Sequence, residues 1–146
     1  MTRLSWFCVA LAAMALSACG QPLREVSHPF YLTYIEDPDA MALFRCPDGP
    51  EGGCAIDGLP GPSIFAAGAS EEYIVVARYP AEGYYAISAD PGVDRSRVEY
   101  LYFARVPNET FGWGNNPEQI VGPLNEADFQ RAKAELGLPD FSIDLR

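Results

Sequence analysis

Two runs of aromatic and β-branched residues constrain the fold of this chain more than any other feature. They cover residues 73–79 and 98–106. Such residues favour extended strands, in which alternate side chains point to opposite faces of the sheet. In the second run Tyr100 and Tyr102 lie on one face, and Leu101 keeps the opposite face partly apolar as well. We therefore predict a central strand, with the core on one face and another element covering part of the other.

Further strands are predicted where similar runs alternate with turn-forming residues. Short linkers on both sides of residues 84–89 favour an antiparallel meander of 73–79, 84–89 and 98–106. Glycine and proline crowd residues 47–62 and exclude regular structure over most of that length. The remaining predicted strands cover residues 30–35, 41–45 and 63–67, with a turn at 37–40.

One helix is predicted in the C-terminal half of the chain. Asn125 is a favourable N-cap, and acidic residues follow it in the first turn, where they complement the helix dipole. Phe129, Ala132 and Leu136 recur on one face, and Gly137 is well placed to end the helix. Because this apolar face is narrow, we expect the helix to pack against the sheet.

These elements predict a single α+β fold. Phe141, Ile143 and Leu145 alternate with polar residues after the helix, which indicates a terminal strand or an extended segment on the core. The whole is expected to be an antiparallel meander sheet of about five to seven strands with one helix in its C-terminal half.

Cys46 and Cys54 flank a short segment rich in glycine and proline. Outside the cytoplasm such thiols are usually oxidised, so we expect an intrachain disulfide. Closing so short a loop stabilises the fold by about 2.5 kcal/mol on the chain-entropy model. A zinc site would need further Cys or His ligands, and a redox pair normally has Cys-x-x-Cys spacing.

The beginning of the chain has the layout of a secretory signal peptide. Arg3 precedes an apolar run over residues 4–16, and small residues then lead to a cysteine. The final four residues of this stretch, Leu16-Ser17-Ala18-Cys19, resemble the lipobox of bacterial lipoproteins. The resemblance implies cleavage after Ala18 and acyl chains on the sulfur and the new amino group of Cys19.

Other interpretations of this stretch remain open. A transmembrane anchor needs about 20 apolar residues, which is more than residues 4–18 offer. An ordinary secretory signal would be cut after an Ala-x-Ala-like site, and residues 15–18 match that pattern poorly. A buried amino-terminal helix would be unusually poor in polar residues.

The lipobox interpretation divides the chain into a signal peptide (residues 1–18), a lipidated tether (19–29) and one globular domain (30–146). In lipoproteins of bacteria with two membranes, an Asp after the acylated cysteine commonly signals retention in the inner membrane. Gly20 at that position therefore favours the outer membrane, with the domain facing the periplasm. His28, the only histidine, falls in the tether, where a catalytic base would lack a fixed partner.

The charge of the chain limits its partners. The formal net charge is −10, and removing residues 1–18 takes away one arginine and no acidic residue, which leaves −11. A chain this acidic is poorly suited to nucleic acid or to direct adsorption on anionic lipid. Its charge is complementary to that of a basic protein.

The sequence contains no recognisable catalytic constellation. It has no glycine-rich phosphate loop, zinc-protease motif or serine-nucleophile elbow, so we expect no catalytic residues, cofactor or metal. Acidic residues that are close in sequence are interpreted as solvated turn residues rather than as acid–base pairs. These are Asp37 with Asp39, Glu71 with Glu72, and Asp90 with Asp94.

Phe111 and Trp113 stand out because they lie in a loop otherwise rich in glycine and asparagine. Large aromatic residues contribute much of the binding energy of protein interfaces, so both are candidate partner-binding residues. The alternative is that they fold back and cover one end of the sheet.

Together these features favour a lipid-anchored, non-catalytic binding protein of the bacterial cell envelope. Its expected partner is a basic envelope protein, in the manner of an inhibitor or immunity protein. An envelope enzyme that uses carboxylates on a glycan or peptide, and a purely structural lipoprotein, are the alternatives. Residues 70–140, with aromatic strands followed by Gly122-Pro123-Leu124 and an acidic helix, resemble several small bacterial lipoproteins. Those families carry no established activity, so the resemblance adds no site residue.

Overall fold

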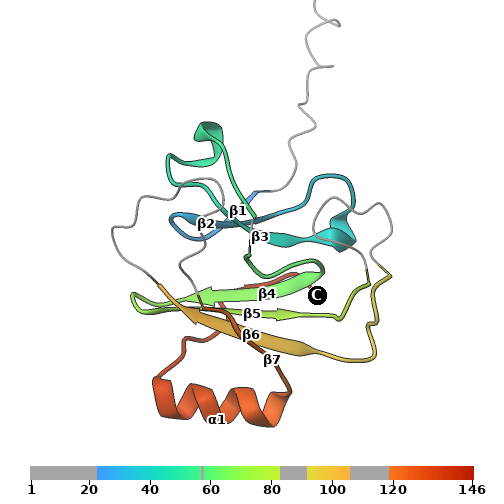
Figure 1. Cartoon of the computed structure of the whole chain (residues 1–146), viewed down its shortest axis with the longest axis vertical. Coiled ribbons are helices and arrows are strands. Elements are labelled where there is room, and N and C mark those ends of the chain that lie inside the picture. The colour runs from blue at the N-terminus through green and yellow to red at the C-terminus, as the bar shows by residue number, and fades with distance from the viewer. Residues whose placement is uncertain (1–22, 57, 83–91, 106–118) are drawn as a thin grey trace, which may run out of the picture.

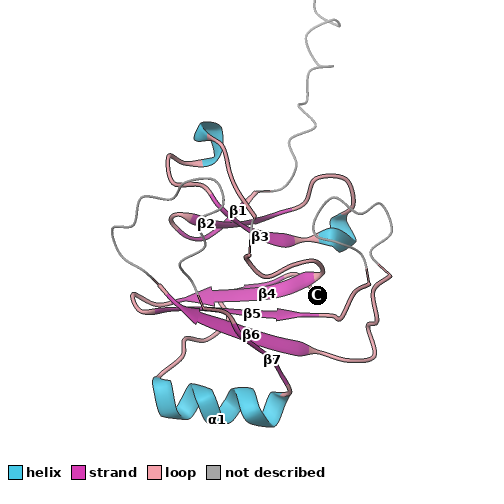
Figure 2. Cartoon of the chain, in the orientation of Figure 1, coloured by secondary structure: helices cyan, strands magenta, loops and turns pink. Residues whose placement is uncertain are grey.

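The chain forms two antiparallel sheets and one helix, arranged in three layers (Figures 1 and 2). The computed structural model describes residues 23–56, 58–82, 92–105 and 119–146. A three-stranded sheet has the order β1-β2-β3, and a five-stranded sheet has the order β7-β6-β5-β4-β8. Helix α1 lies on the face of the larger sheet that points away from the smaller one. The α+β class, the antiparallel pairing and the single helix in the C-terminal half are therefore confirmed.

The smaller sheet contains β1 (Arg24–Ser27), β2 (Phe30–Thr33) and β3 (Ala42–Arg45). A short 3-10 helix, η1 (Pro38–Ala40), lies between β2 and β3, and the side chain of Asp37 caps it by accepting a hydrogen bond from the Asp39 amide. The predicted strands at 30–35 and 41–45 are present, but they belong to a separate sheet instead of joining one large meander.

The prediction that residues 19–29 form only a tether is corrected at residues 24–27, because these form β1 and pair with β2. Arg105 helps to explain why this segment is ordered. Its Nη1 donates hydrogen bonds to Ser27 Oγ at 2.8 Å and to the Ser70 carbonyl at 2.9 Å, and its Nη2 donates to the His28 carbonyl at 2.8 Å. The guanidinium thus joins the first hairpin to the larger sheet, while the His28 side chain is exposed.

The larger sheet contains a meander from β4 to β7, with β8 added at the edge of β4. The strands are β4 (Ile64–Ala69), β5 (Tyr73–Arg78), β6 (Glu99–Ala104), β7 (Val121–Leu124) and β8 (Ile143–Asp144). β5 pairs directly with β4 on one side and with β6 on the other. The prediction that residues 84–89 stand between β5 and β6 is therefore wrong; residues 84–89 themselves lie outside the described part of the chain.

The main core fills the space between the two sheets. The β6 prediction is confirmed, since Leu101 and Phe103 face this core, whereas Tyr100 and Tyr102 pack in the cluster beneath the helix. Phe30 of the smaller sheet meets Phe103 edge to face, with ring centroids 5.4 Å apart. Both sheets contribute to the buried residues of this core, which are Phe30, Leu32, Met41, Leu43, Leu59, Ile64, Ala67, Ile74, Val76, Leu101 and Phe103.

Helix α1 (Glu126–Leu136) begins and ends at the predicted residues. The side chain of Asn125 accepts a hydrogen bond from the Asp128 amide, and Gly137 ends the helix in the left-handed conformation with φ 69°. Phe129 is buried and stacks on Tyr100, with ring centroids 4.8 Å apart. Leu136 was predicted on the same face but is 41% exposed. The turn at Gly137 redirects the chain, so that Leu138 packs in the cluster beneath the helix instead.

Gly68 allows the C-terminal segment to pass close to β4. A Cβ atom built at this position would lie 2.0 Å from the carbonyl oxygen of Asp140 and 3.1 Å from the Cα of Phe141. Both contacts are with backbone, which cannot rotate away as a long side chain can. The requirement for glycine here comes from a close approach between segments far apart in the sequence.

We expect Gly68→Ala to lower the free energy of unfolding by about 2–3 kcal/mol, because the new methyl group overpacks against backbone. Urea denaturation followed by circular dichroism measures this loss. Gly137→Ala is the matched control: it adds the same methyl group in open space but at a positive φ, and should cost only about 1 kcal/mol. A Gly68→Ala loss equal to or smaller than that of the control would contradict this account of Gly68.

Candidate functional site

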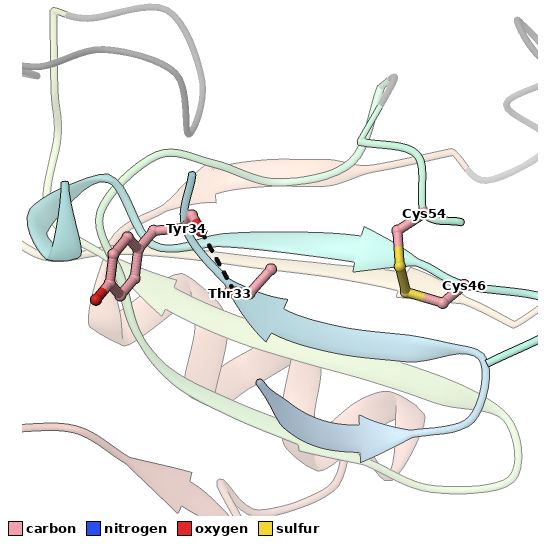
Figure 3. The surroundings of a disulfide bond; sticks show 4 residues. All are labelled: Thr33, Tyr34, Cys46 and Cys54. Carbon is pink, nitrogen blue, oxygen red and sulfur yellow. Dashed lines mark hydrogen bonds between the residues drawn. A yellow bond between two sulfur atoms is a disulfide. The ribbon is translucent and has the colours of Figure 1, made fainter. Parts of the chain in front are cut away.

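Cys46 and Cys54 form the predicted disulfide, with a Cα–Cα distance of 4.2 Å (Figure 3). Arg45 and Ala55, the residues just outside the loop, exchange two backbone hydrogen bonds of 2.8 and 2.9 Å. The segment from residue 46 to residue 54, called the acidic loop below, is thus closed at its base by a covalent bond and by a hydrogen-bonded pair.

Two carboxylates in the acidic loop are exposed to solvent. Asp48 and Glu51 form no ion pair with any residue that the structure describes. The 3-10 helix η2 (Pro50–Gly52) and backbone hydrogen bonds of 3.1 Å within the loop fix its shape. The acidic loop therefore carries exposed negative charge on a backbone that is already ordered in the free protein.

The acidic pairs singled out in the sequence serve mainly in caps and ion pairs. Asp37 caps η1, and Asp39 pairs with Arg95 at 2.7 Å. Asp94 accepts hydrogen bonds from Ser96 and Arg97, which lower its pKa to about 2. A general acid needs a raised pKa near the working pH, and Asp94 has the opposite.

Glu71 and Glu72 are exposed at the turn between β4 and β5, as expected of solvated turn residues. Asp90 lies outside the described residues. No group of three or more metal-ligating side chains occurs among the described residues.

A pocket of about 350 Å³ opens between the two sheets, and we call it the end pocket. It lies at the opposite end of the β2–β3 hairpin from the disulfide, since Tyr34 follows the Thr33–Ala42 pair whereas Cys46 follows the Phe30–Arg45 pair (Figure 3). Its lining residues are Arg24, Tyr34, Pro38, Asp39, Met41, Ser63, Ile64, Phe65, Tyr79, Val93, Arg95 and Leu145.

The end pocket combines apolar walls with cationic groups. Met41, Ile64 and Phe65 line it with buried apolar side chains. Arg95 is held by Asp39 at 2.7 Å, and its guanidinium carbon lies 5.3 Å from the centre of the Tyr79 ring. The hydrogen bond and the charge of Asp39 raise the pKa of Arg95. Arg95 is therefore cationic, but it is already neutralised by one carboxylate.

Ser63 is buried in the wall of the end pocket and has a positive φ of 65°. A residue with a side chain rarely adopts this conformation without support. Its hydroxyl reaches the Pro62 carbonyl oxygen at 2.6 Å and also contacts the Tyr79 carbonyl oxygen. Because backbone oxygens engage this hydroxyl, Ser63 links β4 to the end of β5 and is not presented as a nucleophile.

Asp144 and Arg146, beside this end of the larger sheet, are also arranged as an ion pair. Arg146 Nη2 lies 2.7 Å from Asp144 Oδ2, and the guanidinium stacks over Phe65 at 4.5 Å from its ring centre. Hydrogen bonds from Arg146 lower the pKa of Asp144 to about 2. This carboxylate, like Asp94, stays ionised at any ordinary pH.

Of the site residues predicted from sequence, the structure describes only Cys46 and Cys54, and it brings them together. Cys19, Phe111 and Trp113 lie outside the described residues. The end pocket was missed because its lining comes from segments scattered between residues 24 and 145. Strand pairing within each sheet and the stacking of the two sheets bring these segments to one place, and no local motif marks them.

Comparisons with known proteins give no match: no family model, curated protein or solved structure is similar to this chain. Within the described part of the chain, no helix is long and apolar enough to span a membrane.

Proposed function

We propose that this chain is a lipid-anchored, non-catalytic binding protein of the bacterial cell envelope, attached through Cys19 and facing the periplasm. The lipobox-like stretch before Cys19 supports the anchor. The Cys46–Cys54 disulfide suits an oxidising compartment. The end pocket supports binding rather than catalysis, because its polar groups are suited to recognition and its one carboxylate, Asp39, is paired with Arg95.

The main support for a basic protein partner is that many exposed carboxylates in the described part of the chain have no cationic side chain beside them. Six ion pairs occur among the described residues, and each uses one cation and one carboxylate. Many exposed carboxylates in the same part of the chain take part in none of these pairs. They include Glu36, Asp48, Glu51, Glu71, Glu72 and Glu82.

The acidic loop is the part of this surface best suited to contact a basic protein. Ordering a mobile segment on binding costs conformational entropy and weakens the affinity. A loop that is already closed in the free protein avoids most of this loss. Complementary charge speeds the encounter and excludes acidic competitors. We therefore propose that Asp48 and Glu51 lie within the contact with a basic envelope protein, and that the contact weakens with salt.

Lipid attachment is expected to depend on Cys19 and not on Cys8, which lies within the apolar run. In a bacterial host, intact-protein mass spectrometry of the membrane fraction should show a chain that begins at Cys19 and carries added acyl mass. Cys19→Ser should abolish the added mass, and the control Cys8→Ser should leave it unchanged. A wild-type chain without acyl mass, or one beginning at another residue, would contradict the anchor.

Partner binding is expected to depend on the acidic loop more than on total charge. Immobilised wild-type chain should retain a basic protein from envelope extract at low salt and release it at high salt. Asp48→Asn with Glu51→Gln should weaken that binding by about tenfold, measured with the isolated partner.

The matched control is Glu71→Gln with Glu72→Gln, which removes the same charge from another exposed turn. Its affinity should stay close to that of the wild type. Equal losses in the two double variants would show that binding depends on net charge alone and would overturn the role of the loop. Retention of no basic protein would overturn the partner proposal itself.

A further inference from the structure

We propose that the end pocket binds a small amphipathic carboxylate, with the apolar body of the ligand between the two sheets and its carboxylate at Arg24. This inference goes beyond the proposed function, because it concerns a different ligand and the opposite end of the β2–β3 hairpin from the acidic loop.

The apolar residues of the end pocket favour a ligand with an apolar body. Met41, Ile64 and Phe65 are buried and line the pocket, and Leu145 adds a further apolar side chain from the segment after β8. Filling apolar space with apolar groups is favourable at about 25 cal/mol per Å² of surface removed from water. A ligand made only of polar groups would lose hydration against these apolar side chains, which offer it no hydrogen bond.

The charged residues that line the end pocket favour an anionic ligand. Although the whole chain is strongly acidic, the end pocket is lined by Arg24, Arg95 and a single carboxylate, Asp39. Asp39 is engaged by Arg95, whereas Arg24 has no ion-pair partner among the described residues. The lining therefore carries one cation in excess, and a positively charged ligand would be repelled.

Phenol groups complete the polar side of the end pocket. Tyr34 and Tyr79 both line it, and Figure 3 shows the ring of Tyr34 extending from the end of β2, far from the disulfide. Arginine and tyrosine together provide the hydrogen-bond donors that a carboxylate requires. Arg24 belongs to β1, and Tyr34 and Tyr79 directly follow β2 and β5, so the sheets position the backbone that carries these groups.

The size of the end pocket limits the ligand. A volume of about 350 Å³ is at the lower end of the range for small-molecule sites. It suits a carboxylate with a short acyl chain or a single apolar amino-acid side chain. Hexanoate and N-acetyl-leucine represent these two sources, and both place a carboxylate next to an apolar body.

The test is isothermal titration calorimetry on the full chain in a mild nonionic detergent. Each carboxylate is compared with its uncharged amide, hexanamide or N-acetyl-leucinamide, which keeps the same apolar body. We expect at least one carboxylate to bind about tenfold or more tightly than its amide. The tighter of the two carboxylates identifies the source as an acyl chain or an amino-acid derivative.

Three variants then show which arginine binds the carboxylate of the ligand. Arg24→Gln should weaken carboxylate binding by about tenfold. Asp39→Asn should strengthen it, because Arg95 is released from its internal partner. Arg131→Gln, on the outer helix and paired with Asp128, should have no effect. Thermal unfolding of each variant checks that it remains folded.

Equal binding of carboxylates and amides, or no binding of either, would overturn this inference. So would an unchanged affinity in Arg24→Gln, or weaker carboxylate binding in Asp39→Asn, because removing a negative charge from the lining should favour an anion bound there. None of these measurements involves the acidic loop or the Cys19 lipid, so their failure would leave the proposed anchor and the proposed basic partner untouched.

Discussion

The structure depends on one apolar core that the two sheets share. Each sheet has an apolar face that would be exposed if the sheet stood alone, and stacking the faces removes both from water. Leu32 and Leu43 from the smaller sheet meet Ile74 and Val76 from the larger one in a single buried cluster. This contact holds the two sheets face to face, and it therefore sets how the loops and the pocket at their ends are placed relative to each other.

The shared core also separates two surfaces of opposite character. At one end of the β2–β3 hairpin, the disulfide-closed loop presents Asp48 and Glu51 to solvent. At the other end, the space between the sheets is lined by apolar groups and by Arg24 and Arg95. The net negative charge of the chain is therefore not spread evenly: it is exposed at the acidic loop, whereas the end pocket is lined by more cations than carboxylates. The proposed basic partner and the proposed small anion would therefore bind at opposite ends of the hairpin and need not compete.

Local signals in the sequence predicted individual elements well, whereas contacts between distant segments could not be predicted. Asn125 and Gly137 act within a few residues of themselves, so the helix was predicted at its observed bounds. The disulfide was predictable because Cys46 and Cys54 are the only cysteines in the sequence after residue 19. The ordering of β1 depends on Arg105, far along the chain, and the role of Gly68 depends on a backbone passing close to it. The end pocket was missed for the same reason, since its lining is assembled by strand pairing and by the stacking of the two sheets.

Native-state hydrogen exchange measured by NMR tests the shared core most directly. A single core predicts that the slowest amides of β2 and β3 exchange with the same opening free energy, and the same dependence on denaturant, as those of β5. Both sheets would then open only by global unfolding. If the amides of the three-stranded sheet exchanged through a separate opening of clearly lower free energy while β5 stayed protected, the two sheets would not form one cooperative unit. That result would contradict the structural basis proposed for both surfaces.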